Sequence, residues 1–242
     1  MSDDGRIEGV PEHVGRLAAA GIRTVGDVLA RAEAIRDLPD RSNHRLRLAG
    51  HDYHVKREKR RRVSREAAGI VVAGRAGVPV ATLAFHGWDR RFGALAGTVD
   101  LAPARPLDDV LREGLPRPRV EAALRSLARA TAALHHARLH HHDLYLNHVF
   151  LDPSDPEARV TLIDLERLTS HHGILGATVV KDLAAIEASM PEGLLTCRER
   201  ARFLSVYLAD RRFPVRTLLG PLLRRVVRKA ERIRAHVPRT PV

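Results

Sequence analysis

The chain has 242 residues, 44% of them hydrophobic and 29% charged, which allows a substantial core and excludes a disordered tail. Its 41 Lys and Arg against 29 Asp and Glu give a net charge of +12, which favours anionic partners such as nucleotides, nucleic acids, acidic lipids or phosphorylated sugars. The single cysteine, Cys197, excludes an internal disulfide and a cysteine-based zinc cluster, indicates a reducing compartment, and is expected to be a buried small residue. The acidic segment MSDDGRIEG is unlike a signal peptide and the apolar stretches are too short to span a bilayer, so we expect a soluble or membrane-peripheral protein.

Residues 10–36 are expected to form two helices around Gly21, each with an apolar stripe. The turn AAAGIRTVGDVL is similar to half of a helix-hairpin-helix DNA-binding unit. Such a unit needs a glycine-bearing hairpin whose amides face phosphate, whereas Gly15 stands alone here. We therefore predict that residues 1–42 are a helical N-terminal extension that serves packing, and nucleic acid is not expected as a partner.

Residues 43–101 are predicted to form a small sheet with one inserted helix. Apolar and polar residues alternate on both sides of Gly50, which predicts a β-hairpin. Ser64 offers an N-cap to a short helix, with Glu66 in its first turn, where the helix dipole favours an acid. The strands expected in this segment are 45–50, 52–58, 81–88 and 92–101.

Residues 102–242 are predicted to be mostly helical. A long helix begins at Pro118, where apolar residues recur at helical spacing, and ends before a histidine-rich loop at 140–142. Two short apolar runs, 149–152 and 160–164, are separated by the turn PSDPEA and predict a second hairpin. Helices are expected in the last third of the chain.

The segments HHHDLYLNHVFLD and RVTLIDLER contain two acids in the layout of a phosphotransferase site. Asp143 follows a helix and lies five residues before a polar residue that opens the second hairpin, and Asp164 closes that hairpin. In such sites the first acid takes the proton of the acceptor hydroxyl and the second holds magnesium. Each acid alone is a common helix-end or strand-end residue, and only their joint spacing points to this chemistry.

With these residues in place, the chain resembles the lipopolysaccharide core kinase family, which includes heptose and Kdo kinases and their InaA-like relatives within the protein-kinase-like superfamily. These proteins carry a histidine where protein kinases carry the loop asparagine. The resemblance covers about residues 43–210 and is strongest at 139–166. It implies an α+β, two-lobed protein-kinase-like fold, with a small antiparallel-sheet N-lobe (43–101) containing one helix and a mostly helical C-lobe (102–242). The matching string H-x-D-x-Y-x-x-H comprises His141, Asp143, Tyr145 and His148.

The resemblance also implies the cofactors ATP and Mg²⁺ and a role for each site residue. Lys56 would hold the nucleotide phosphates and Glu66 would fix Lys56, although they could instead be a surface lysine in the run KREKRRR and a first-turn acid. His141, Asp143 and His148 would form the catalytic loop, with Asp143 as base. Asp164 would hold magnesium, with His148 as a further metal ligand or as a residue that orients acceptor or water. Asp182 would hold the backbone of the catalytic loop.

Three features limit this interpretation. No G-x-G-x-x-G precedes Lys56, so phosphate binding by backbone amides is not expected. No A-P-E follows Asp164 and only about fifteen residues separate it from KDLAA, which argues against a protein acceptor. The histidines near Asp143 lack a neighbouring Cys or Glu at the spacing of a zinc motif, so a structural zinc site is not expected.

The sequence therefore predicts an ATP-dependent phosphotransferase acting on a sugar hydroxyl, by resemblance heptose or Kdo of a lipopolysaccharide core or a related glycan. The alternatives are a small-molecule kinase of the aminoglycoside or choline type, which would carry asparagine at His148, and a catalytically weak pseudokinase.

The basic C-terminal segment 211–239 is expected to form a helix with one apolar stripe and a displaced face of arginines, including Arg224, Arg225, Arg228 and Arg232. This face would be solvated, or would contact anionic lipid or phosphorylated sugar. The expected location is the cytoplasm, with peripheral binding to the inner face of the cytoplasmic membrane.

Overall fold

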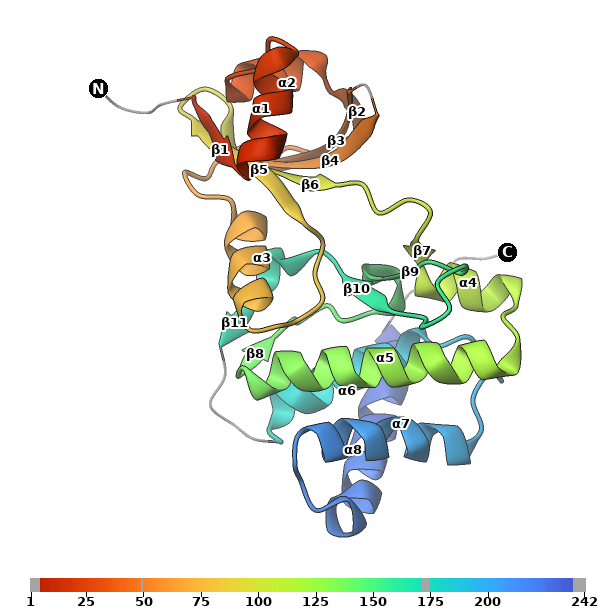
Figure 1. Cartoon of the computed structure of the whole chain (residues 1–242). Coiled ribbons are helices and arrows are strands. Elements are labelled where there is room, and N and C mark those ends of the chain that lie inside the picture. The colour runs from red at the N-terminus through yellow and green to blue at the C-terminus, as the bar shows by residue number, and fades with distance from the viewer. Residues whose placement is uncertain (1–4, 49, 171–174, 237–242) are drawn as a thin grey trace. The chain divides into compact units, whose positions relative to one another are not determined.

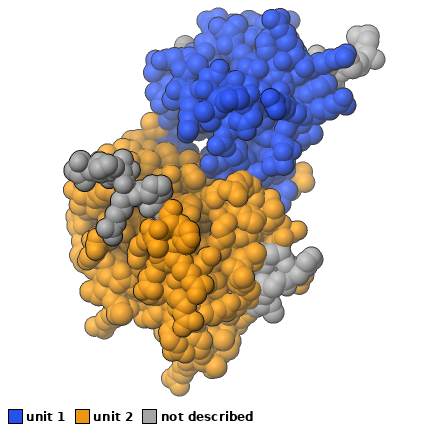
Figure 2. Space-filling model, turned by 180° about the vertical axis from the view of Figure 1, so that it is seen from behind, with its two compact units in different colours: residues 1–72, 81–101, 164–166 blue, residues 73–80, 102–163, 167–242 orange. Residues whose placement is uncertain are grey.

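A computed structural model describes residues 5–48, 50–170 and 175–236 and divides the chain into two compact units (Figure 1; Figure 2). Unit 1 comprises Met1–Val72, Ala81–Leu101 and Asp164–Glu166. Unit 2 comprises Ala73–Val80, Ala102–Ile163 and Arg167–Val242. Unit 1 is built on a sheet and unit 2 is mainly helical, so the predicted α+β class is confirmed.

Unit 1 contains a six-stranded antiparallel sheet with the strand order β1-β5-β6-β4-β3-β2. The hairpin predicted around Gly50 is confirmed, since β3 and β4 pair from Arg41 opposite Glu58 to Leu48 opposite His51. Because side chains alternate along a strand, Tyr53 and Val55 of β4 lie on one face and Lys56 on the other. The strands are β1 (Ile7–Gly9), β2 (Glu33–Asp37), β3 (Arg41–Leu48), β4 (His51–Glu58), β5 (Leu83–Asp89) and β6 (Gly93–Val99).

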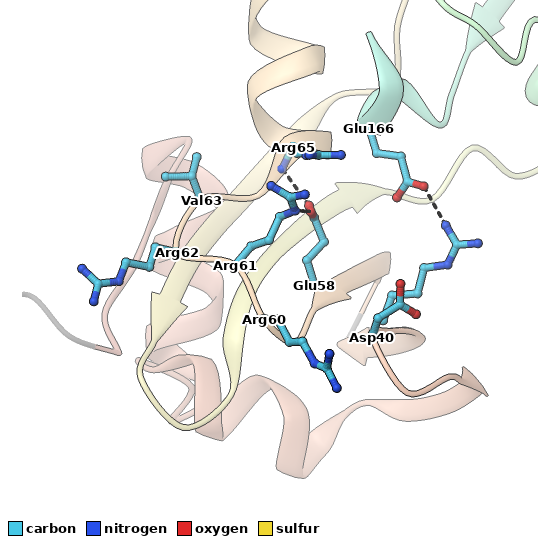
Figure 3. A pocket seen from close by; sticks show the side chains of 9 residues that line it. Asp40, Glu58, Arg60, Arg61, Arg62, Val63, Arg65 and Glu166 are labelled. Atoms are coloured by element: carbon cyan, nitrogen blue, oxygen red, sulfur yellow. Dashed lines mark hydrogen bonds and ion pairs between the residues drawn. The ribbon is translucent and has the colours of Figure 1, made fainter.

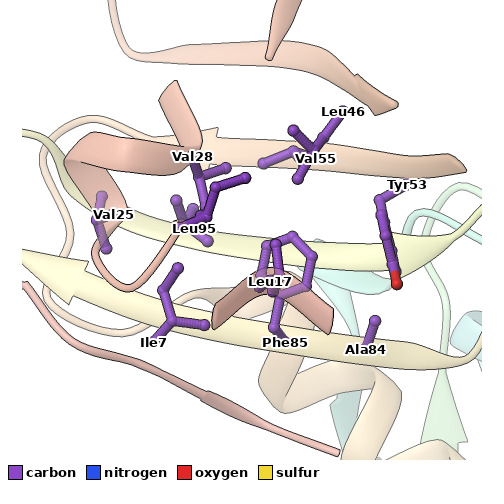
Figure 4. Packing of buried hydrophobic residues seen from close by; sticks show 11 residues of the cluster. Ile7, Leu17, Val25, Val28, Leu46, Tyr53, Val55, Ala84, Phe85 and Leu95 are labelled. Atoms are coloured by element: carbon purple, nitrogen blue, oxygen red, sulfur yellow. The ribbon is translucent and has the colours of Figure 1, made fainter. Parts of the chain in front are cut away.

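Helices α1 (Pro11–Ala19) and α2 (Val25–Arg31) pack their apolar residues against this sheet. Leu17, Val25 and Val28 are fully buried with residues of β3 to β6, and Figure 4 shows this cluster around the ring of Phe85. A Cβ atom at Gly97 would come within 2.2 Å of that ring, so β6 needs glycine there. The packing role predicted for the two helices is confirmed.

The N-terminal segment differs from the prediction in one respect. Residues 1–42 were expected to be helical, but β1 pairs with β5 and β2 pairs with β3, so the segment belongs to the sheet of unit 1. All side chains of β2 are exposed, and the strand therefore lacks the alternation that would identify it in the sequence. The predicted boundary at residue 101 also fails for two short segments. Residues 73–80 belong to unit 2 although they were expected in the N-lobe, and residues 164–166 belong to unit 1 although they were expected in the C-lobe.

The third helix of the chain, α3 (Arg65–Arg75), begins as predicted, since the Ala67 N–H donates to Ser64 Oγ at 3.2 Å. Its first residues, through Val72, belong to unit 1 and the remainder to unit 2.

Unit 2 consists of helices with short strands beside them. Helix α5 packs against α7, and α8 packs against both α6 and α7. The predicted long helix and the second hairpin, β9 with β10, are confirmed. The helices are α4 (Leu107–Glu113), α5 (Arg117–His136), α6 (Ala177–Ser189), α7 (Cys197–Asp210) and α8 (Val215–His236), and the strands are β7 (Arg105–Pro106), β8 (Leu139–His140), β9 (Val149–Leu151), β10 (Val160–Leu162) and β11 (Thr169–Ser170). Two 3₁₀ turns cover Leu146–His148 and Leu165–Arg167.

Cys197 is exposed, so the expectation of a buried cysteine was wrong. It is the first residue of α7, directly after Thr196, whose side chain caps the helix by accepting from the Glu199 N–H at 3.3 Å. The neighbouring residues Thr196 and Arg198 are exposed as well, so this end of α7 lies at the surface. Within the described residues, none of the helices has the length and apolar character needed to cross a membrane.

Candidate active site

Lys56 of β4 lies among three carboxylates in unit 1. Its Nζ is 2.5 Å from Asp164 Oδ1, 2.9 Å from Glu166 Oε2 and 3.5 Å from Glu66 Oε2. The Lys56 side chain is only 12% exposed, so Lys56 is not an ordinary surface lysine. The structure thus brings together three residues that the sequence singled out, Lys56, Glu66 and Asp164, and adds a fourth, Glu166, that it did not.

The electrostatics of this cluster keep Lys56 charged. Burial alone would lower the pKa of the Lys56 ammonium, but the neighbouring Glu66 and Asp164 outweigh burial and raise that pKa above its usual value. Burial also raises the pKa of Glu66, an effect that the positive charge of Lys56 opposes. The cluster therefore holds a fixed positive charge surrounded by three carboxylates.

The backbone around Asp164 is held in an unusual conformation. Asp164 has a φ of 60°, in the left-handed region that few residues other than glycine adopt. The next N–H, of Leu165, donates to the Glu66 carboxylate. Gly69 of α3 lies against the same peptide, since a Cβ atom there would come within 2.4 Å of the Leu165 carbonyl oxygen. Glycine at position 69 therefore lets α3 approach the segment that carries Asp164 and Glu166.

A cavity of about 100 Å³ adjoins Lys56 and Asp164 in unit 1. Among its lining residues, Asn43 has a buried Oδ1 atom that accepts no hydrogen bond from any residue that the structure describes. Arg36 and Arg41 also line the cavity, one on each side of the turn between β2 and β3. This turn, Leu38 to Asp40, contains no glycine. Positively charged side chains are therefore available here where related folds use backbone amides of a glycine-rich loop.

A second cavity of unit 1, of about 600 Å³, contains Glu166 at its edge and is lined by five arginines (Figure 3). Arg41 donates to Glu166 Oε1 at 2.7 Å, and Glu58 is contacted by Arg61 at 3.4 Å. Glu166 is thus shared between Lys56 and Arg41, and the surroundings of the Lys56 cluster are strongly basic. The arginines are Arg41, Arg60, Arg61, Arg62 and Arg65.

The predicted catalytic loop lies in unit 2, between β8 and β9. The carboxylate of Asp143 accepts a hydrogen bond from Arg167 Nη1 at 2.7 Å, and its backbone carbonyl accepts from His148 Nδ1 at 2.7 Å. His141 donates from Nε2 to the carbonyl of Ile163 at 3.0 Å. In this structure both histidines therefore orient the backbone of the loop, and the further roles predicted for them remain predictions.

Asp182 of α6 binds the backbone of this loop, which confirms the role that the resemblance implied for it. Its carboxylate is fully buried and accepts from the backbone N–H groups of His141 at 2.9 Å and His142 at 3.0 Å. It also accepts from His140 Nδ1 and, at 3.3 Å, from His135 Nε2. His142 has a φ of 72°, so the loop turns sharply just before Asp143.

The buried group His135, His140 and Asp182 has a spacing that could hold a metal ion. Its hydrogen bonds already account for these atoms, because His135 Nε2 donates to Asp182 and His135 Nδ1 accepts from the Tyr207 hydroxyl at 2.9 Å. Burial lowers the pKa of His135 despite the neighbouring carboxylate. The group is best explained as a hydrogen-bonded support for the catalytic loop.

Comparison with known proteins places the chain in a family. The family model described as the lipopolysaccharide kinase (Kdo/WaaP) family matches residues 22–207. The chain belongs to this family. The match includes Lys56, Asp143 and Asp164 and ends before α8 begins.

A curated WaaP sequence and a solved WaaP structure are both similar to this lipopolysaccharide kinase family member. The lipopolysaccharide core heptose(I) kinase WaaP of Pseudomonas aeruginosa is 35% identical over 147 residues, which are 57% of this chain and 53% of the relative. The match thus spans about half the length of this curated relative. A solved structure of WaaP in complex with acyl carrier protein is 28% identical, with a TM-score of 0.75, and the comparison covers 94% of this chain and 99% of that one. The kinase-like fold implied by the sequence motif is confirmed.

Proposed function

We propose that this protein is an ATP-dependent kinase of a sugar hydroxyl, with heptose or Kdo of a lipopolysaccharide core or a related glycan as acceptor. Membership of the lipopolysaccharide kinase family and the similarity to a core heptose kinase support this proposal. The observation that carries it is the contact of buried Lys56 with Glu66 and Asp164. A strand lysine paired with a helix glutamate, beside an aspartate that can hold magnesium, is the arrangement that kinases use at the nucleotide phosphates.

Each residue has a chemical role in this proposal. Lys56 would neutralise the nucleotide phosphates, and Arg36 and Arg41 would add the positive charge that a glycine-rich loop would otherwise provide through its amides. Asp143 would accept the proton of the acceptor hydroxyl. Arg167, bound to Asp143 at 2.7 Å, would orient that carboxylate.

The donor atoms near Lys56 also fit magnesium. Mg²⁺ prefers oxygen ligands, and Asp164 and Glu166 provide carboxylate oxygens on one short segment of unit 1. Bound Mg²⁺ would supply charge neutralisation at the phosphates. His148 suits this ion less well, because it offers nitrogen and its Nδ1 already donates to the Asp143 carbonyl. We therefore propose Asp164 and Glu166 as the metal ligands.

The proposed location is the cytoplasm, with peripheral binding at the inner face of the membrane. A glycolipid acceptor and the basic face of α8, where Arg224, Arg225, Arg228 and Arg232 are exposed, support this placement. Since a solved WaaP is in complex with acyl carrier protein, we propose that protein as a candidate partner as well. Co-purification from cells expressing both proteins would test the partner.

A nucleotide-dependent thermal shift tests the proposed function. The melting temperature of the parent should rise with ATP and rise further with ATP and Mg²⁺ together. Lys56→Ala should lose this stabilisation, whereas Lys59→Ala, at the nearby lysine that pairs with Asp37, should keep it. A Lys56→Ala protein that responds to ATP like the parent would contradict the assignment. Transfer of the γ-phosphate to a glycan then separates an active kinase from a pseudokinase, and transfer only to aminoglycosides or choline would favour the small-molecule alternative.

A further inference from the structure

A basic cavity of about 550 Å³ lies in unit 2 between α6 and α8. Every residue with a formal charge on its wall is a cation, and neither Asp nor Glu belongs to the lining that the described part of the chain provides. Two of the four lysines in the whole sequence contribute to it. The charged lining residues are Lys181, Arg225, Arg228, Lys229 and Arg232.

Four of these cations have no protein partner in the described part of the chain. Arg225 donates to the carbonyl of Leu175 at 3.0 Å, but the side chains of Lys181, Arg228, Lys229 and Arg232 make no hydrogen bond or ion pair there. Other arginines of unit 2 are neutralised, as Arg200 is by Glu187 at 2.9 Å. Unpaired like charges on one wall repel one another, and this arrangement is stabilised when an anion binds.

The start of α6 adds to the positive potential of the cavity. Ala177 and Thr178, in the first turn of this 13-residue helix, both line the wall. The N-cap residue Gly176 has no side chain to accept from the first amides, and the first turn contains no acid. The first amides of a helix, with the positive end of the helix dipole, complement the surrounding cations in binding an anion.

We propose that this cavity is a binding site for a phosphate group, carried by a glycan or a lipid. Several cations that converge on one concave wall match the charge and the acceptor oxygens of a phosphate ester. If the protein is the proposed kinase, the site would anchor a phosphorylated acceptor near the catalytic loop. His142, the residue before Asp143, lines the same cavity. The lining comes partly from α6, which lies within the match to the lipopolysaccharide kinase family model, and partly from α8, which lies beyond it.

Isothermal titration calorimetry with inorganic phosphate in chloride buffer tests the site. The parent should bind phosphate, and the double variant Lys181→Ala, Lys229→Ala should bind it about 10-fold more weakly or worse, because two charge-assisted contacts are lost. The matched control is Arg198→Ala, Arg216→Ala, which removes two exposed cations of α7 and α8 that do not line the cavity. It should change the affinity by no more than about 2-fold. Equal weakening in both variants, or no binding by the parent, would overturn the proposal.

Vesicles distinguish the sources of the phosphate. If lipid headgroups occupy the site, the parent should sediment with phosphatidylglycerol vesicles, free phosphate should compete, and only the Lys181→Ala, Lys229→Ala protein should fail to sediment. If the site takes soluble phosphate esters, that variant should lose phosphate binding while its vesicle binding equals that of the parent. Neither experiment contains ATP, so a failure of the phosphate site can be distinguished from a failure of the proposed kinase function.

Discussion

Lys56 Nζ lies 2.5 Å from the carboxylate of Asp164, although 108 residues separate the two in the sequence. The contact links the central strand β4 to the end of the second hairpin, where the left-handed backbone of Asp164 turns its side chain toward the lysine. A buried ammonium needs such partners, because an unpaired charge in this position would be strongly unfavourable. In the proposed kinase, nucleotide phosphates would take the place of Asp164 beside Lys56, and Mg²⁺ would neutralise the released carboxylate.

Replacement of Asp164 should remove the response to magnesium. In Asp164→Ala the ATP-dependent thermal shift should no longer increase when Mg²⁺ is added, because a hard oxygen ligand is lost. Glu166→Gln should reduce this magnesium-dependent increase, while the thermal shift produced by ATP without Mg²⁺ should equal that of the parent. The control Glu157→Ala, in the exposed turn of the same hairpin, should match the parent. A full magnesium increment in Asp164→Ala would place the metal site elsewhere.

Gly69 should be sensitive to the smallest substitution. Gly69→Ala would place a Cβ atom 2.4 Å from the Leu165 carbonyl, so α3 or the Asp164 segment must shift, at a cost of about 1–3 kcal/mol in unfolding free energy. Weaker ATP binding should accompany this loss, since Glu66 lies on the same helix. Gly74→Ala is the matched control, because its Cβ would make only an ordinary 3.6 Å contact and should be neutral or stabilising. Urea unfolding of both variants checks the difference, and equal stabilities would contradict the close approach.

Asp182 should be essential for the stability of the catalytic loop. Asp182→Asn keeps the shape of the side chain but turns one acceptor oxygen into a donor, which then faces the N–H groups it formerly accepted. We expect a loss of about 1–3 kcal/mol in unfolding free energy, because a buried N–H group is left without its acceptor. Asp210→Asn, at a partly exposed residue of α7, should change stability little. An Asp182→Asn protein as stable as the parent would show that the loop does not depend on this carboxylate.

The pH dependence of stability should report on His135. The pKa of His135 is lowered by burial, so below pH about 6.5 the unfolded chain binds a proton that the folded protein does not. The free energy of unfolding therefore decreases as the pH is lowered below about 6.5. The slope should approach about 1.4 kcal/mol per pH unit for this residue, with His44 and His54 adding in the same direction because burial lowers their pKa as well. Unfolding free energies at pH 7.5 and 5.5 should differ less in His135→Gln than in the parent. The exposed neighbour variant His136→Gln should retain the parental difference, and an unchanged difference in His135→Gln would contradict the assignment.

The sequence identified those parts of the molecule that depend on local patterns. The hairpin around Gly50, the cap at Ser64 and the hairpin between Asp143 and Asp164 follow from alternation and turn residues, and the structure contains all three. The motif residues Lys56, Glu66 and Asp164 were found because their types and order match a known chemistry. Their contacts in the structure agree with that order.

The residues that were missed depend on contacts between distant segments. Glu166 contacts Lys56 from 110 positions away, and nothing in its local sequence distinguishes it from a surface acid. Gly69 has its effect through the Leu165 carbonyl, which a helical pattern cannot reveal. Strand β2 exposes all its side chains and is determined by backbone pairing with β3. Signals of this kind need the fold itself.

Phosphoryl transfer by Asp143→Asn tests the central claim most directly. The measurement is single-turnover transfer of labelled γ-phosphate from ATP to a heptose-containing lipopolysaccharide core, beside the ATP affinity of the same protein. Because asparagine keeps the size of the side chain but cannot accept the hydroxyl proton, the rate should fall by about 100-fold or more while ATP affinity stays within about 2-fold of the parent. An Asp143→Asn protein that transfers phosphate at the parental rate would contradict the proposed mechanism.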